Sequence, residues 1–200
     1  MSALGFLRTT GDAVARSPME RQAQAAGAHF DVRDGWNVAV AFEGESLDAA
    51  VWWADLSHLA KVEVIGPHEL ELGQAARVND GWHCPVTRDR ALVLGDRSAE
   101  GVDLTSSLAA LAIGGPHARE LFARFCALDL RDRSMPLQAF RPGSVARTPG
   151  FVVREDEHRF LMLFGWALGE YVWTVVADAA GELGGAPVGA DALDRQVARA

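Results

Sequence analysis

Six histidines and two cysteines are the side chains of this sequence best suited to bind a metal or attack a substrate. The histidines are His29, His58, His68, His83, His117 and His158. None of them falls into the HExxH or HxH spacing that places two imidazoles on one zinc ion. The sequence therefore predicts no metal site, and it predicts surface or capping roles for the histidines.

The cysteines lack the surroundings of a reactive thiol. Cys126 lies among apolar residues of a predicted helix, where burial resists ionisation to the thiolate. Cys84 follows His83 on a predicted strand, where neighbouring side chains point to opposite faces, so one metal ion could hardly bind both. The sequence also has no GxSxG turn, GxGxxG loop or P-loop. We expect no catalytic residue and no nucleotide site in this chain.

Two aspartates, Asp80 and Asp103, are the candidates for contact with a cofactor. Asp80 adjoins the side-chain donor Asn79. Asn-Asp-Gly is also a common hairpin turn, which is the interpretation we favour there. Asp103 begins the second copy of a unit that occurs at Asp55–His68 and again at Asp103–His117.

Both copies of this unit have the same order of features. Each begins with Asp-Leu-Ser or Asp-Leu-Thr, continues with apolar residues at a period of two and ends in Gly-Pro-His. This order predicts a cap, a turn, a strand and a Gly-Pro turn that starts an acidic helix. We expect the helix over 118–128 in the second copy and only a stunted helix at 69–72 in the first. Because the Gly-Pro turn occurs twice, we interpret it as scaffold rather than as an anion site.

Composition narrows the class of protein. A formal charge of −8 without any run of Lys or Arg argues against nucleic acid as a partner. No apolar run approaches the ~20 residues of a membrane-spanning helix. The N-terminus lacks the cationic start and the long apolar core of a signal peptide, so we expect a cytoplasmic protein that is not bound to a membrane.

The remaining periodicities predict an α+β fold of duplicated mixed and antiparallel β units with packed helices. Helices are expected at 19–28 and 168–180, a turn at 141–143, and strands at 36–42, 75–78, 82–85, 90–94 and 158–164. We divide the chain into an N-terminal arm (1–16), one domain (17–182) with repeats at about 36–95 and 96–182, and a C-terminal tail (183–200) with a flexible start.

Several short motifs, in this order, carry a resemblance to a known family. The second half resembles the gamma subunit of heterotetrameric sarcosine oxidase, through DLTSSL at 103–108, GGPHARELF at 114–122, CALDL at 126–130, PGSVART at 142–148 and YVW at 171–173. The first half is similar to the glycine-cleavage T-protein superfamily, to which that subunit belongs. The motifs there are AGA at 26–28, GW at 35–36, ADLSHLAKVEVIGP at 54–67 and WHCPVTRDR at 82–90.

The resemblance implies an aminomethyltransferase-like folate-binding domain and a place in an enzyme complex. It implies a non-catalytic gamma-type subunit of a sarcosine or related N-methyl amine oxidase or dehydrogenase. Larger flavoprotein partner subunits would carry FAD, FMN, NAD and tetrahydrofolate, and this chain alone would bind no cofactor. The alternatives are a tetrahydrofolate-dependent one-carbon transferase, with Asp80 or Asp103 near the folate, and a free-standing folate-binding protein.

The tryptophans are the candidates for a partner interface. Tryptophan is enriched at interface hot spots, although a buried core position explains it equally well. Trp52 and Trp53 are adjacent, so both cannot face the same core. We predict interface roles for Trp52, Trp53 and Trp82.

Overall fold

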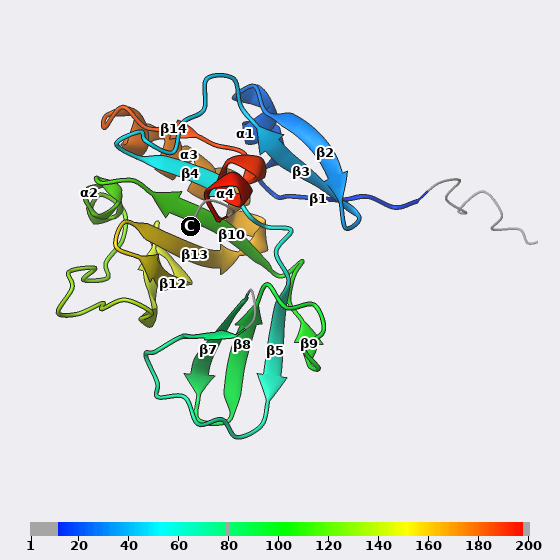
Figure 1. Ribbon diagram of the computed structural model, residues 1–200, viewed down its shortest axis with the longest axis vertical. Coiled ribbons are helices and arrows are strands. Elements are labelled where there is room, and N and C mark those ends of the chain that lie inside the picture. Colours follow the sequence, from blue (N-terminus) through cyan, green and yellow to red (C-terminus); the bar gives the residue numbers. More distant parts are fainter. Residues whose placement is uncertain (1–11, 79–80, 198–200) are drawn as a thin grey trace, which may run out of the picture.

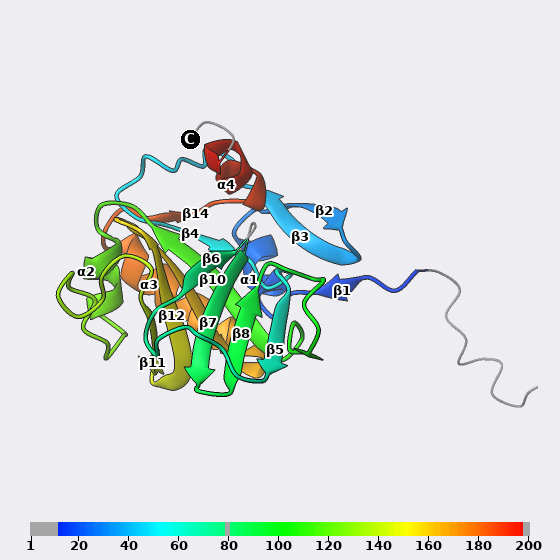
Figure 2. The same cartoon turned by 60° about the horizontal axis from the view of Figure 1, so that its bottom comes forward.

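A computed structural model describes residues 12–78 and 81–197 (Figure 1). Two large β-sheets face each other, and helices gather at one of them (Figure 1 and Figure 2). A third, small sheet lies at the side. This arrangement confirms the predicted α+β class. Among the described residues, no helix has the length and apolar character needed to cross a membrane.

The first sheet is antiparallel and has the strand order β6-β7-β8-β5-β9. Its strands are β5 (Lys61–Ile65), β6 (Ala76–Val78), β7 (Gly81–Thr87), β8 (Arg90–Leu94) and β9 (Val102–Asp103). The strands predicted at 75–78, 82–85 and 90–94 are therefore confirmed within a few residues. The predicted turn residues Asn79 and Asp80 lie outside the described part of the chain.

The second sheet repeats this order as β11-β12-β13-β10-β4 and adds β14 at its edge. Its strands are β4 (Trp52–Asp55), β10 (Leu108–Gly114), β11 (Phe140–Val145), β12 (Thr148–Asp156), β13 (Arg159–Gly165) and β14 (Ala186–Pro187). The hairpin β12–β13 contains a bulge between Arg154 and Asp156, and β7–β8 contains one between Pro85 and Thr87. The duplication thus extends well beyond the repeated motif.

The two repeats exchange their first strands. β4 precedes the first copy in sequence but pairs with β10, so that Asp55 lies opposite Leu111. β9 precedes the second copy but pairs with β5, so that Asp103 lies opposite Val62. The predicted repeats at about 36–95 and 96–182 are therefore interlocked, because each supplies a strand to the sheet of the other.

Three helices cover the outer face of the second sheet. They are α1 (Glu20–Ala25), α2 (Ala118–Ala123) and α3 (Gly169–Gly181), the last preceded by a 3-10 turn at Trp166–Leu168. Apolar side chains of β10 and β13, such as Leu111 and Phe160, pack there against Val172 and Val176 of α3. The opposite face of this sheet packs on the first sheet through residues such as Leu163 and Leu94. Figure 1 shows the first sheet at the end of the molecule away from these helices.

The C-terminal segment predicted as a tail is part of the fold. β14 pairs in parallel with β4, and the amide of Val188 donates to the carbonyl of Trp53 at 2.8 Å. Helix α4 (Ala190–Val197) then packs on β3. At the bend between them, a Cβ on Gly189 would lie 2.0 Å from the carbonyl oxygen of Val40, so only glycine fits. The flexible start predicted for the tail is wrong.

The small sheet has the order β1-β3-β2 and joins both ends of the described chain. Its strands are β1 (Ala15–Arg16), β2 (His29–Arg33) and β3 (Trp36–Ala41). β1 pairs in parallel with β3, so the predicted arm also has an ordered end. The predicted helix at 19–28 is confirmed over Glu20–Ala25.

Two predicted features around 118–143 are corrected by backbone pairing. α2 ends at Ala123, because the following residues pair with the β11–β12 turn: the Ala127 amide donates to Ser144 at 3.0 Å. Cys126 therefore lies beyond the helix, bridged to Val145. The predicted turn at 141–143 lies inside β11, and the hairpin turns at 146–147 instead.

Candidate functional site

The candidate ligand site is a cavity of about 140 Å³ between the two sheets. The first sheet contributes Trp82 and Leu94, and the second contributes Leu161. The turn after β4 contributes Leu56, and α4 contributes Leu193. Such apolar walls resemble those of small cavities that take one ring-sized apolar molecule.

The polar groups at the rim of this cavity contact one another. The Trp82 indole donates to a carboxylate oxygen of Glu155 at 2.8 Å, and Nε of Arg159 lies 3.3 Å from the other oxygen. The Arg77 guanidinium lies 5.2 Å from the centre of the Trp82 ring, a cation–π contact. Glu155 is thus held by one indole donor and one ion pair, which suits a structural carboxylate better than a general base. Neither Glu155 nor Arg159 stood out in the sequence, because their contact with Trp82 depends on how the sheets face each other.

Of the two cofactor candidates, Asp103 does not line this cavity. Asp80 lies outside the described residues. Asp103 is exposed on β9, and its carboxylate accepts the amide of Thr105 at 2.8 Å. The Thr105 hydroxyl and this amide hold the pKa of Asp103 below its usual range. Asp103 therefore closes the turn of the second copy.

The turns of the two copies hold each other by reciprocal hydrogen bonds. The Ser57 hydroxyl accepts the amide of Ala110 at 3.3 Å, and the Thr105 hydroxyl accepts the amide of Lys61 at 3.1 Å. The residues before these hydroxyls repeat the pattern, since the Leu56 amide donates to Ala110 and the Leu104 amide to Lys61. Each cap predicted from the sequence thus binds the strand of the other copy. This explains why the unit is needed twice.

The two copies differ at the strand residue whose backbone makes these hydrogen bonds. Lys61 of β5 is fully buried, whereas the equivalent residue of β10 is Ala110. The Lys61 ammonium donates to the carbonyls of Ser57 at 2.9 Å and Leu59 at 2.8 Å. Burial lowers the pKa of Lys61 to about 7, against the attraction of Asp55 and Asp103. The only sign of this buried lysine in the sequence was its alignment with Ala110 of the other copy.

Asp55 is also buried, whereas its counterpart Asp103 is exposed. Its carboxylate accepts the hydroxyl of Ser17, just before α1, and the amide of Ser57 at 2.9 Å. Burial raises the pKa of Asp55, and the hydrogen bonds from Ser17 and Ser57 oppose this rise. The cluster of Ser17, Asp55, Ser57 and Lys61 therefore anchors the N-terminal segment at the junction of the repeats.

Histidines and cysteines occupy scaffold positions. His68 lies 2.6 Å from the carbonyl oxygen of Thr87, and His117 precedes α2 with Glu120 at 3.1 Å. Burial raises the pKa of both Cys84 and Cys126, which leaves them poor nucleophiles. In the part of the chain that the structure describes, no group of three or more His, Cys, Asp or Glu side chains could hold a metal ion.

All three tryptophans predicted at a partner interface are buried within this chain. Trp53 faces the helices and meets Trp173 edge to face, with ring centres 5.8 Å apart. Trp52 faces the other side of β4, towards α4. Trp82 lies between the sheets. The two neighbours do face different cores, as predicted, but these burials leave no exposed indole to carry the predicted interface.

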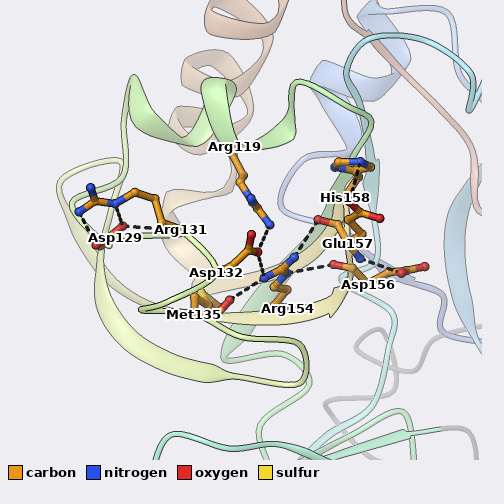
Figure 3. Close-up of polar contacts among 9 residues, drawn as sticks. All are labelled: Arg119, Asp129, Arg131, Asp132, Met135, Arg154, Asp156, Glu157 and His158. Atoms are coloured by element: carbon orange, nitrogen blue, oxygen red, sulfur yellow. Dashed lines mark hydrogen bonds and ion pairs between the residues drawn. The ribbon is translucent and has the colours of Figure 1, made fainter.

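A buried arginine closes the other end of the second sheet (Figure 3). The Arg154 side chain is 4% exposed, and its guanidinium donates to Asp132 at 2.6 Å and to the Met135 carbonyl at 2.8 Å. It also donates to the carbonyls of Asp156 and Glu157, each at 3.3 Å. Arg154 thus fixes the segment after α2 onto the β12–β13 turn.

Comparisons with known proteins found matches by structure but none by sequence. No protein-family model matches the sequence, and no curated protein matches it in a sequence search. A chain of the heterotetrameric sarcosine oxidase from Corynebacterium sp. U-96, in complex with pyrrole 2-carboxylate, matches with a TM-score of 0.66 at 18% identity. The match covers 86% of this chain and 98% of that chain.

The glycine cleavage system aminomethyltransferase T from Bartonella henselae matches with a TM-score of 0.71 at 16% identity. That match covers 90% of this chain, but this chain spans only 61% of the aminomethyltransferase. At such identities the likeness concerns the fold. The chain therefore has the T-protein-like, aminomethyltransferase-like fold that its resemblance implied, in a form also found in a chain of a sarcosine oxidase.

Proposed function

We propose that this chain is a non-catalytic, gamma-type subunit of a heteromeric complex that oxidises sarcosine or a related N-methyl amine. The proposal rests on how much of each known chain this fold covers. The fold matches a chain of heterotetrameric sarcosine oxidase over 98% of that chain, but only 61% of an aminomethyltransferase. The described fold therefore aligns with nearly the whole of the first chain and with part of the second.

The candidate cavity supports a scaffold role. Its volume of about 140 Å³ is well below the ~300–1,000 Å³ of sites that bury a drug-sized ligand. The one carboxylate at its rim, that of Glu155, already binds Trp82 and Arg159. A folate-sized molecule would have to displace α4 or the side chains of the first sheet.

In this proposal the redox chemistry belongs to larger flavoprotein partner subunits in the cytoplasm. Their FAD, FMN and NAD would oxidise the N-methyl group, and tetrahydrofolate on a partner would accept the one-carbon unit. This chain would supply surface and stability to the assembly. The reciprocal bonds between its repeats suit that role, because they join the two sheets.

Co-expression tests the proposal directly. The chain is produced with the larger flavoprotein subunits of a sarcosine oxidase-like complex, and the complex is isolated and assayed with sarcosine and other N-methyl amines. We expect a stable assembly that contains this chain, and loss of assembly or activity when the chain is omitted. Separate purification of both components without any association would contradict the proposal.

Calorimetry on the isolated chain tests the alternative functions. We expect no tight binding of tetrahydrofolate by this chain alone. Tight binding would instead favour a free-standing folate-binding protein. Tight binding together with transfer of a one-carbon unit would favour an autonomous transferase.

A further inference from the structure

A groove of about 460 Å³ lies between the end of α2, the first turns of α3 and the β11–β12 turn. Phe125 and Cys126 form one wall, and Val175 of α3 contributes to the other. Tyr171, also on α3, is 46% exposed at the rim. The groove is separate from the cavity between the sheets, because it lies on the helix-covered side of the second sheet.

The turn at one end of the groove has an unfavourable backbone conformation. Ala146 and Arg147 both have positive φ values, of 47° and 61°. A two-residue hairpin turn of this type favours Asn-Gly, and side chains other than those of Asn, Asp and Gly make it costly. Such strain tends to persist where the side chain has a function.

Backbone contacts hold this turn in place. The Ala146 amide donates to the carbonyl of Phe125 at 2.9 Å, and the Ala127 amide donates to that of Ser144 at 3.0 Å. The Ala146 methyl group is buried in the main core. Arg147 is therefore presented from a fixed position rather than from a free loop.

Arg147 is the uncompensated charge of the groove. Its exposed guanidinium has no hydrogen bond or ion pair among the described residues. The other cation, Arg124, is paired with Glu182 and lies 3.9 Å from Glu120. None of the residues that line the groove has a carboxylate, although the whole chain carries a formal charge of −8.

We propose that this groove receives an acidic segment of a larger flavoprotein subunit. A carboxylate of that segment pairs with Arg147, and an adjacent apolar side chain packs between Phe125 and Tyr171. Arginine and tyrosine are the residue types that dominate interface energies, and a guanidinium binds a carboxylate through two parallel hydrogen bonds. This inference rests on the proposed function and adds to it where the partner binds.

Charge reversal in the reconstituted complex tests the groove. Arg147→Glu is compared with Arg88→Glu, which makes the same change at an exposed arginine in the β7–β8 turn of the other sheet. We expect Arg147→Glu to weaken the complex at least 10-fold, and Arg88→Glu to leave it within 2-fold of the unchanged chain. Higher salt should weaken the unchanged complex and narrow this difference, because an exposed ion pair is screened.

Arg147→Gly separates binding from folding. Glycine relieves the positive φ, so the free chain should melt at a higher temperature, yet the complex should weaken because the cation is lost. Tyr171→Ala should weaken the complex without any gain in melting temperature. Hydrogen exchange in the complex should show protection at 123–127 and 145–148.

The outcomes distinguish this inference from the proposed function. If the complex forms with the unchanged chain and equally well with Arg147→Glu, the groove is not the docking surface, while the assembly role stands. If the unchanged chain forms no complex with the flavoprotein subunits, both proposals fail. If Arg147→Glu instead disrupts a homodimer of the isolated chain, the occupant is a second copy of this chain and our assignment is wrong.

Discussion

The first and second sheets have one backbone plan but different side chains at equivalent positions. The second sheet is closed on its outer face by three helices and at its end by Arg154. The bulge position of Arg154 is occupied by Pro85 in the first sheet. The first sheet has instead the buried Lys61, where the second has Ala110. The same strand pairing thus supports two different surroundings: helices cover only the second sheet, whereas both sheets line the cavity.

The largest effect on this comparison is expected at Arg154. Arg154→Leu removes the donor to three backbone carbonyls and leaves only Arg119 to bind the exposed Asp132 carboxylate, so the variant should lose about 2–3 kcal/mol of stability. Arg133→Leu, at an exposed arginine nearby, should cost less than ~0.5 kcal/mol. Urea unfolding measures both. A loss below ~1 kcal/mol for Arg154→Leu would mean that the end of the second sheet is closed by something else.

Lys61, which is buried in the first copy, should make the stability of the protein depend on pH. The unfolded chain keeps the Lys61 proton up to its ordinary pKa of 10.5, whereas the folded chain loses it at about 7. Stability should therefore rise between pH 7 and 10, by at most about 1.4 kcal/mol per pH unit. The neutral amine still has two N–H groups for the Ser57 and Leu59 carbonyls.

Lys61→Met should remove this rise, because methionine does not titrate. Urea unfolding at pH 7, 8, 9 and 10 compares the two chains. Parallel curves would show that Lys61 keeps an ordinary pKa in the folded protein. Ala110→Ser is a control at the equivalent residue of the second copy and should leave the pH dependence unchanged.

The reciprocal hydroxyls should be unequal in strength. Ser57→Ala removes the acceptor for the Ala110 amide and a donor to the buried Asp55, so it should cost about 2 kcal/mol. Thr105→Val removes the same bonds around the exposed Asp103, so it should cost about 1 kcal/mol. Thermal or urea unfolding resolves this difference. Equal losses would indicate that burial of Asp55 is not what distinguishes the two turns.

A further difference between the copies concerns His58, whose place in the second copy is taken by Ser106. Burial, with the nearby charges of Lys61 and Arg97, lowers the pKa of His58 to about 4. The unfolded chain binds this proton near pH 6.5, so the contribution of His58 to stability is lost as pH falls from about 6.5 to 4.

Titration of the His58 ring followed by NMR checks this value, with His58→Gln to assign the signal. Ser106→His places an imidazole at the exposed position of the second copy, where it should titrate close to 6.5. A His58 midpoint near 6.5 would show that the turn of the first copy is open to solvent.

The sequence by itself determined the repeated unit, most strand positions and the turns that join them. The Asp-Leu-Ser and Asp-Leu-Thr caps could be predicted because an aspartate accepts an amide two residues on, a contact within a few bonds of the chain. Strand β8 was predicted at its observed bounds from local periodicity. Such features depend on near neighbours in sequence.

Only the tertiary structure decided what each of these elements meets. A period of two shows that Trp52 and Trp53 face opposite sides of a strand, but not that both sides are covered. The exchange of β4 and β9 and the pairing of β14 join residues far apart in the chain, and many alternative pairings satisfy the same pattern. Arg154 was missed for the same reason, because its acceptors come from distant loops. The local sequence determines the secondary structure of a segment, whereas the tertiary structure determines which residues contact it. In this chain, those contacts form the candidate sites.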